Sequence, residues 1–144
     1  MLKWLAQRWI LVSVVGAIAA FLAFCSIKAS AMYAFQHDCA AQGFLRALHP
    51  VVIDFLDTHG RWPTKNDIQA RDIKNASDGA GGILDSVELE TLWAECELLT
   101  PSRSQDPVAV IPSTQKYQGE QCSNVLCADG DICTQPLSRY YQEK

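Results

Sequence analysis

An uncharged, apolar run near the start of the chain constrains its fold more than any other feature. Residues 9–27 are nineteen consecutive uncharged residues, of which only Ser13 and Ser26 are plainly polar. At about 1.5 Å of rise per residue, a helix of this length reaches roughly 28 Å, close to the thickness of a bilayer's hydrocarbon core. The run therefore predicts a single transmembrane helix over residues 9–28.

The distribution of charge predicts the direction in which this helix crosses the membrane. Lys3 and Arg8 precede the run, whereas all 16 acidic residues follow it. Basic flanking residues stay in the cytoplasm, so we expect residues 1–8 there, and everything after Lys28 on the periplasmic or extracellular side of the inner (plasma) membrane. The exported part holds nine of the 12 basic residues, which leaves it a formal charge of −7. This balance excludes the Lys and Arg excess that nucleic-acid binding requires.

A cleaved signal peptide is the alternative interpretation of the same segment. A basic start, an apolar stretch and the small residues Ala29 and Ala31 match a signal peptide that is cut after Ala31. Two features favour an uncleaved anchor instead. The apolar run is longer than a usual signal core, and Lys28 lies between the run and the cleavage site. Both interpretations export the rest of the chain.

Small residues recur at helical spacing within the predicted span. The series is Ser13, Gly16 (or Ala17), Ala20 and Ala23. Small side chains on one face let a second helix approach closely inside a membrane. The pattern indicates a candidate face for packing against another membrane protein, although an Ala-rich helix that faces only lipid has the same composition.

A second apolar pattern follows over residues 29–60. Apolar residues recur every three or four positions, as in an amphipathic helix; they are Leu45, Leu48, Val52, Phe55 and Leu56, with Met32, Phe35 and Cys39 at similar spacing before them. We expect Arg46, Asp54 and Asp57 on the wet face of this helix. Pro50 predicts a kink or a restart, and Gly60 predicts the end of the helix in a left-handed cap. The apolar stripe is expected to pack on the rest of the chain.

Residues 61–144 are expected to form a small exported domain, which makes the fold α+β with a short antiparallel sheet. Thr64 and Asp67 match a helix start, which predicts a helix over residues 66–74 and a loop over 75–82. Residues 86–99 fit a helix, favoured by local propensity and by the capping pair Asp85 and Glu88, or a strand with a bulge near Thr91. Residues 108–111 are a strand candidate, and the final thirty residues are polar and rich in turns.

The cysteines indicate an oxidising compartment. Cys122, Cys127 and Cys133 form a C-x4-C-x5-C pattern, and Cys96 lies in the preceding apolar segment. In an exported domain this density favours disulfides, and we expect two bridges among these four cysteines, with all three pairings open. Cys39 is then a free thiol, a bridge between two copies, or a partner that displaces one of the four. The pattern lacks the paired C-x-x-C knuckles of a zinc site, so no metal is expected.

No motif for catalysis or cofactor binding is recognisable in the sequence. A G-x-S-x-G elbow, a phosphate-binding loop and an H-E-x-x-H motif are all missing. The densest group of carboxylates has the spacing of an exposed face; it comprises Glu88, Glu90, Glu95 and Glu97. We therefore expect neither an enzyme nor a bound cofactor.

Residues 55–64, FLDTHGRWPT, resemble the end of the long helix in type IV pilins and in the pseudopilins of type II secretion. In this segment Gly60 caps the helix, Trp62 anchors the turn to the sheet, and Pro63 blocks re-entry into a helix. The wider layout is also similar, with a short basic start, an apolar helix that becomes amphipathic, and a small outer domain. The span lacks the glycine junction and the glutamate of the prepilin-peptidase signature, so processing by that enzyme is not implied.

These patterns together predict a non-enzymatic, single-pass membrane protein. Its small exported domain would serve as a structural or interaction subunit of a cell-envelope assembly, with the membrane and other envelope proteins as partners. The alternative is a secreted, soluble, disulfide-bonded protein that binds or inhibits a partner after cleavage at Ala31.

Overall fold

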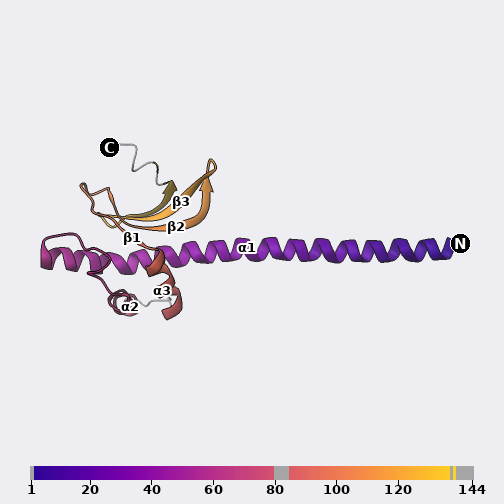
Figure 1. Ribbon diagram of the computed structural model, residues 1–144, viewed down its shortest axis with the longest axis horizontal. Coiled ribbons are helices and arrows are strands. Elements are labelled where there is room, and N and C mark those ends of the chain that lie inside the picture. Colours follow the sequence, from indigo (N-terminus) through magenta and orange to yellow (C-terminus); the bar gives the residue numbers. More distant parts are fainter. Residues whose placement is uncertain (1, 80–84, 137, 139–144) are drawn as a thin grey trace. The chain divides into compact units, whose positions relative to one another are not determined.

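The computed structural model describes the backbone of residues 2–79, 85–136 and 138, with side chains from Val12 onward within these ranges. The chain separates into two units, Met1–Phe35 and Gln36–Lys144. Helix α1 (Leu2–His59) contributes to both units, and it passes through Pro50 without ending (Figure 1). The restart expected at Pro50 is therefore not seen. Leu48 and Val52, on either side of Pro50, are fully buried, and this burial offsets the backbone hydrogen bond that the proline removes.

The first unit presents apolar side chains that the chain itself does not cover. Every residue over positions 12–33 is exposed. The large apolar ones are Val12, Val14, Val15, Ile18, Phe21, Leu22, Phe24, Ile27, Met32 and Tyr33. Among the described residues, α1 is the one helix long and apolar enough to cross a membrane, a property that it would share with a signal sequence at this position.

In the second unit, the apolar stripe of α1 forms the centre of the hydrophobic core. Phe44, Leu45, Leu48 and Val52 are fully buried, which confirms the amphipathic pattern over this stretch. The wet face is also confirmed, because Arg46, Asp54 and Asp57 are exposed. The stripe does not extend back as expected, since Met32, Phe35 and Cys39 are all exposed.

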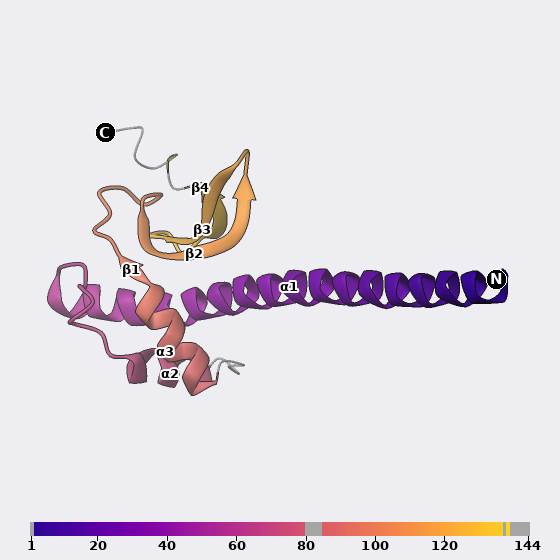
Figure 2. The ribbon, with the colours of Figure 1, turned by 45° about the vertical axis from the view of Figure 1, so that its right-hand side comes forward.

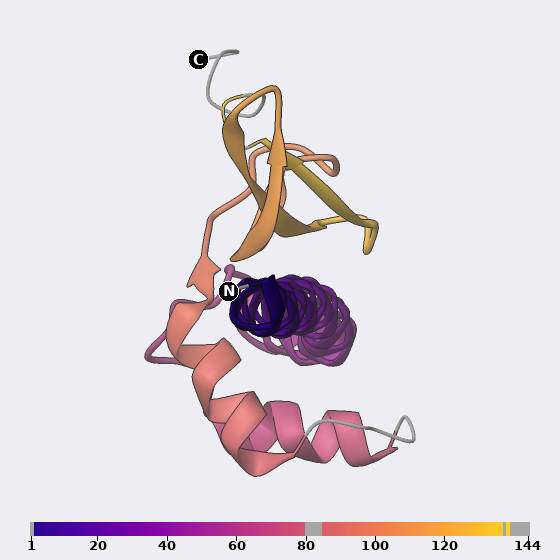
Figure 3. The ribbon, with the colours of Figure 1, turned by 90° about the vertical axis from the view of Figure 1, so that its right-hand side faces the viewer.

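An antiparallel sheet of four strands packs on residues 36–59 of α1. The strands are β1 (Glu97–Leu98), β2 (Pro107–Tyr117), β3 (Glu120–Cys127) and β4 (Ile132–Pro136), and they lie in the order β1-β2-β3-β4. This arrangement confirms the α+β class and the antiparallel sheet. The register shifts between Pro112 and Lys116, where β2 bends (Figure 2). The helices α2 and α3 lie on the other side of this part of α1 (Figures 1 and 3).

The C-terminal strands differ from the expectation for the final thirty residues. Residues predicted there as a turn-rich tail form β3 and β4, and the predicted strand at 108–111 is only the start of β2. Six consecutive residues of β3, from Cys122 to Cys127, are buried. A strand buried on both faces does not alternate between apolar and polar residues, which is the signal that sequence analysis seeks.

Two short helices, α2 and α3, lie in the segments 66–82 and 86–99. Helix α3 (Ser86–Glu95) begins at Asp85, whose side chain accepts a hydrogen bond from the Glu88 amide, and β1 follows it directly, so residues 86–99 contain both helix and strand. Helix α2 (Ala70–Gly79) starts later than predicted and continues through most of the expected loop, while residues 80–82 of that loop lie outside the described residues. The predicted contact is present, because Asp67 accepts hydrogen bonds from the Thr64 amide and hydroxyl. It closes a turn over residues 65–67 and not a helix, and the first turn of α2 is capped by Asp72, which accepts from the Gln69 amide.

Gly130, in the turn between β3 and β4, is a position where a side chain should not fit. Its φ is +93°, and an added Cβ would lie 3.0 Å from Cε1 of His49 on α1. We expect Gly130→Ala to lower the free energy of unfolding by about 1–3 kcal/mol, because a residue with a Cβ is strained in this conformation. Urea unfolding followed by tryptophan fluorescence measures the change.

Gly43 provides the control for this substitution. It lies inside α1, and a Cβ there would meet nothing within 4 Å. Gly43→Ala should raise stability by up to about 1 kcal/mol, the difference in helix propensity between these residues. Equal stability of Gly130→Ala and the wild type would show that the turn relaxes away from His49.

Candidate functional site

The most unusual polar group of the second unit is a carboxylate buried between α1 and the sheet. Asp38 is 4% exposed. Its oxygens accept hydrogen bonds from the Thr114 amide (3.2 Å) and hydroxyl (2.9 Å), from Gln115 Nε2 (3.3 Å) and from Asn124 Nδ2 (3.2 Å). Asn124 is fully buried, and its Oδ1 accepts from the Thr134 hydroxyl at 2.7 Å. These bonds link α1 to β2, β3 and β4.

The negative charge of Asp38 is stabilised by hydrogen bonds from uncharged donors. Burial raises the pKa of Asp38, but the hydrogen bonds from Thr114, Asn124 and Ser113 outweigh it and lower the pKa below its ordinary value of 3.8. The nearest basic atom is Nδ1 of His37, at 3.8 Å. Because the carboxylate is ionised and its acceptor positions face the sheet, this cluster is suited to fixing the position of α1 rather than to proton transfer.

The turn that follows α1 is held by a dense set of local bonds. Gly60 has φ +65°, and its amide donates to the Leu56 carbonyl at 2.7 Å, which is the left-handed cap expected there. Pro63 is buried, and Trp62 is half-buried against the main core cluster. Arg61 donates to both oxygens of Asp67 at 2.8 and 2.9 Å, and this pairing holds the pKa of the Asp67 carboxyl well below its ordinary value.

Lys65 connects this turn to the end of α3. Its ammonium donates to the carbonyls of Ala94 (2.9 Å) and Cys96 (2.7 Å), and it lies 5.3 Å from the ring centroid of Trp93. A cation at the C-terminal end of a helix satisfies carbonyls that have no partner within the helix. The segment after α1 is therefore a fixed part of the fold.

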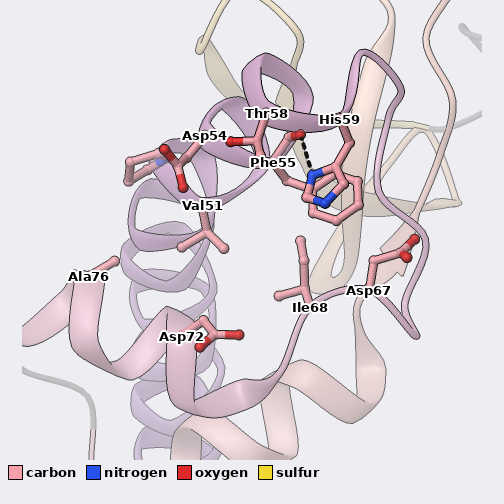
Figure 4. A pocket seen from close by; sticks show the side chains of 10 residues that line it. Val51, Asp54, Phe55, Thr58, His59, Asp67, Ile68, Asp72 and Ala76 are labelled. Carbon is pink, nitrogen blue, oxygen red and sulfur yellow. Dashed lines mark hydrogen bonds between the residues drawn. The ribbon is translucent and has the colours of Figure 1, made fainter.

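A pocket of about 470 Å³ opens beside the last turns of α1 (Figure 4). Its walls are apolar at Val51, Phe55 and Ile68, and Asp54, Asp67 and Asp72 add carboxylates. Three of its polar groups already have local partners: Asp67 pairs with Arg61, Asp72 accepts from the Gln69 amide, and His59 Nδ1 donates to the Phe55 carbonyl at 3.1 Å. The pocket presents negative charge and no nucleophile activated by a base. Within the described ranges, no three or more His, Cys, Asp and Glu side chains are placed to hold a metal ion.

The cysteines do not form the two bridges that were expected. No disulfide is present in the part of the chain that the structure describes. Each of the three pairings would join Cys96, next to β1, to a cysteine of β3 or β4, and β2 lies between them. Two strand spacings amount to roughly 10 Å, beyond the ~7 Å limit for the Cα separation of a disulfide. Burial also raises the pKa of the Cys96 thiol to about 12, which keeps it protonated and unreactive.

Cys127 and Cys133 are the two cysteines that the sheet brings together. The pairing of Val125 with Cys133 and of Leu126 with Ile132 places Cys127 diagonally across from Cys133. Both contribute to a second apolar cluster with Val110 and Val125. Cys122 is buried three residues before Val125 on β3, and Cys39 is exposed on α1.

The small-residue face predicted in the span is exposed. Ser13, Gly16, Ala20 and Ala23 all lie on the surface of α1, among the larger exposed apolar side chains of the first unit. Their packing against another helix stays a prediction, because the structure contains a single chain.

Comparison with known proteins assigns this chain to no family. No protein-family model, no curated protein and no solved structure matches this chain. The layout, a long apolar N-terminal helix followed by a small four-stranded antiparallel sheet, is compatible with pilin-like folds. This similarity concerns the arrangement of helices and strands and does not indicate an activity.

Proposed function

We propose that this protein is a single-pass membrane protein, with its N-terminus in the cytoplasm, that presents a small α+β domain as a structural or interaction subunit of a cell-envelope assembly. The observation that carries the proposal is the uncovered apolar surface over residues 12–33. Each large apolar side chain placed in water costs about 1.5–3 kcal/mol relative to burial. A bilayer is the environment that removes this cost along a whole helix.

Two further observations support a structural role. Residues 36–59 of α1 form the centre of the hydrophobic core, so the helix that emerges from the span is part of the domain and not a detachable tether. In addition, the polar groups with the most numerous bonds, Asp38 and Asp67, hold elements together. An envelope subunit needs an outer domain that is stably folded in this way.

The compartment leads to a prediction about the cysteines. An exported domain meets thiol oxidants, which accept two electrons and two protons when two thiols join. Cys127 and Cys133 are diagonal neighbours on adjacent strands, with Cα atoms expected roughly 7–8 Å apart, so that closing a disulfide between them requires a small movement of the two strands. We propose that this pair forms the bridge of the mature domain.

Intact mass spectrometry of protein from its host tests the anchor. Thiols are alkylated before reduction, and the membranes are washed with alkaline carbonate. We expect the full-length mass in the carbonate-resistant pellet, with Cys127 and Cys133 protected from alkylation. A mass that begins at Met32, recovered in the soluble fraction, would replace the anchor by a cleaved signal peptide and redirect the search to soluble targets.

The role as a subunit needs a separate measurement. The chain is 15.9 kDa, and native electrophoresis of membranes solubilised in mild detergent should place it in a larger species. Substitution of Gly16 and Ala20 by leucine tests whether the small-residue face holds that species together, with Val15→Leu as the control on a neighbouring exposed position. Migration of the wild type as a monomer under all detergent conditions would contradict an assembly.

A further inference from the structure

The apolar surface of the first unit continues well beyond Lys28, where the predicted span ends. Residues 29–35, ASAMYAF, contain no charged side chain. Met32 is 63% exposed, Tyr33 74% and Phe35 70%, compared with 54% for Ile18 and 59% for Leu22 within the span. These side chains after Lys28 are thus as exposed as those inside the predicted membrane segment, although they lie beyond the end of the span predicted from its length.

This second apolar stretch surrounds the helix and does not form a stripe. Successive residues of an α-helix are rotated by about 100°, so Ala31 and Tyr33 lie on nearly opposite faces. Of residues 29–35, only Ser30 is polar. A helix that is apolar on all sides belongs in a core or in a membrane, whereas a second helix would cover one face and leave the others in water. The chain's own core begins later, with Asp38 and Ala41.

We propose that the membrane-associated segment extends to Phe35, and that residues 29–35 lie in the outer interfacial layer of the bilayer. This inference rests on the proposed membrane anchor. Residues 9–35 span about 40 Å as a helix, which matches the 40–45 Å of a bilayer with its headgroups. Polar side chains follow this segment directly, as Gln36, His37 and the buried Asp38.

The side chains of this stretch suit an interface between hydrocarbon and water. Tyr33 has an apolar ring and a polar hydroxyl, and tyrosine is enriched at this depth of membranes. Lys28 has an aliphatic stem that lets its ammonium reach the headgroup phosphates. The same ammonium lies 5.6 Å from the ring centroid of Phe24, a contact that offsets part of the cost of a charge near hydrocarbon. Lys28 is therefore compatible with a boundary layer and does not mark the end of the membrane segment.

The native cysteines serve as depth markers for the test. Cys25 lies within the span, and Cys39 is exposed on α1 beyond Phe35. The full chain is reconstituted in vesicles of phosphatidylethanolamine and phosphatidylglycerol, with the domain outside, and treated with a membrane-impermeant maleimide. Ala31→Cys and Tyr33→Cys introduce thiols on nearly opposite faces, and labelling at each site is followed over time by peptide mass spectrometry. Both positions are exposed and precede the core, so the domain is expected to fold in both variants.

We expect both introduced thiols to react at least tenfold more slowly than Cys39, as Cys25 does. Reaction of both at the rate of Cys39 would overturn the inference and place residues 29–35 in water. Protection of one face alone, together with oxidative cross-linking at the protected position, would overturn it in favour of a second copy of the chain. Rapid labelling of Cys25 would contradict the membrane anchor itself, so failure of the two proposals can be told apart.

Discussion

Replacement of Asp38 by alanine is expected to lower the free energy of unfolding of the domain by about 2–4 kcal/mol, because hydrogen bonds to a charged group contribute about 1.5–3 kcal/mol and their loss strands buried donors. Asn124, which is fully buried, would lose the acceptor of its amide, and Thr114 would lose the acceptor of its hydroxyl. The contact between α1 and the sheet would then hold unpaired polar groups. Urea unfolding at pH 7, followed by tryptophan fluorescence, measures the loss.

The same carboxylate predicts a pH dependence. Its pKa is lowered in the folded protein, so the unfolded chain binds a proton more tightly than the folded chain does. Its contribution to stability is therefore present above the ordinary pKa of 3.8 and is lost as the pH falls through the folded value. Asp38→Asn should flatten the decline in stability of the wild type below about pH 4, since asparagine has no proton to gain.

Asp57→Ala is the matched control for Asp38→Ala. Asp57 lies on the same helix but is exposed, so its removal should change the free energy of unfolding by no more than about 0.5 kcal/mol. If Asp38→Ala and Asp57→Ala unfolded at the same urea concentration, the network around Asp38 would contribute nothing to the attachment of α1.

Phe44→Ala is expected to be the most destabilising single change, at about 3–5 kcal/mol for an aromatic removed from a core. Phe44 is fully buried in the main core cluster. Its ring centroid lies 6.4 Å from that of Trp93, which connects α1 to α3. Alanine would leave a cavity between these helices, so the unfolding midpoint should fall and the emission of Trp93 should move to longer wavelength.

Phe35→Ala is the control for Phe44→Ala, because it makes the same substitution at an exposed position. Phe35 lies on the same helix nine residues earlier and is 70% exposed. In this variant the free energy of unfolding of the domain should stay unchanged, and only the binding of the chain to the membrane should weaken. A loss in Phe35→Ala as large as that in Phe44→Ala would mean that residues before Asp38 contribute to the folded core.

The sequence predicted the helices of this fold better than its strands. Apolar spacing identified the buried stripe around Leu45 and Leu48, and local chemistry identified Gly60 as a cap and Asp85 as the start of α3. These features depend on residues three or four positions apart. The strands β3 and β4 depend on pairing across the sheet and on burial against α1, and the buried polar residues Ser123 and Asn124 of β3 hide the apolar pattern. The start of α2 was misplaced because the bonds between Thr64 and Asp67 close a turn over residues 65–67 and not a helix.

The polar cluster at Asp38 escaped prediction for a related reason. A signal was present, since Asp38 lies on the same helical face as Ala41 and Leu45, where an acidic residue is out of place. Its partners Thr114 and Asn124 are 76 and 86 residues away, and no local rule connects them. The density of cysteines predicted disulfides, but strand register is needed to show that Cys96 lies apart from the other three candidates.

The strand order has a consequence for biogenesis. Each strand pairs with its neighbour along the chain, so the sheet can grow one hairpin at a time during synthesis. The attachment of α1 is completed later, because Asn124 of β3 follows its partner Asp38 by 86 residues. Until β3 has formed, the apolar stripe of residues 41–52 stays uncovered, and this interval is when the nascent chain is most exposed to aggregation.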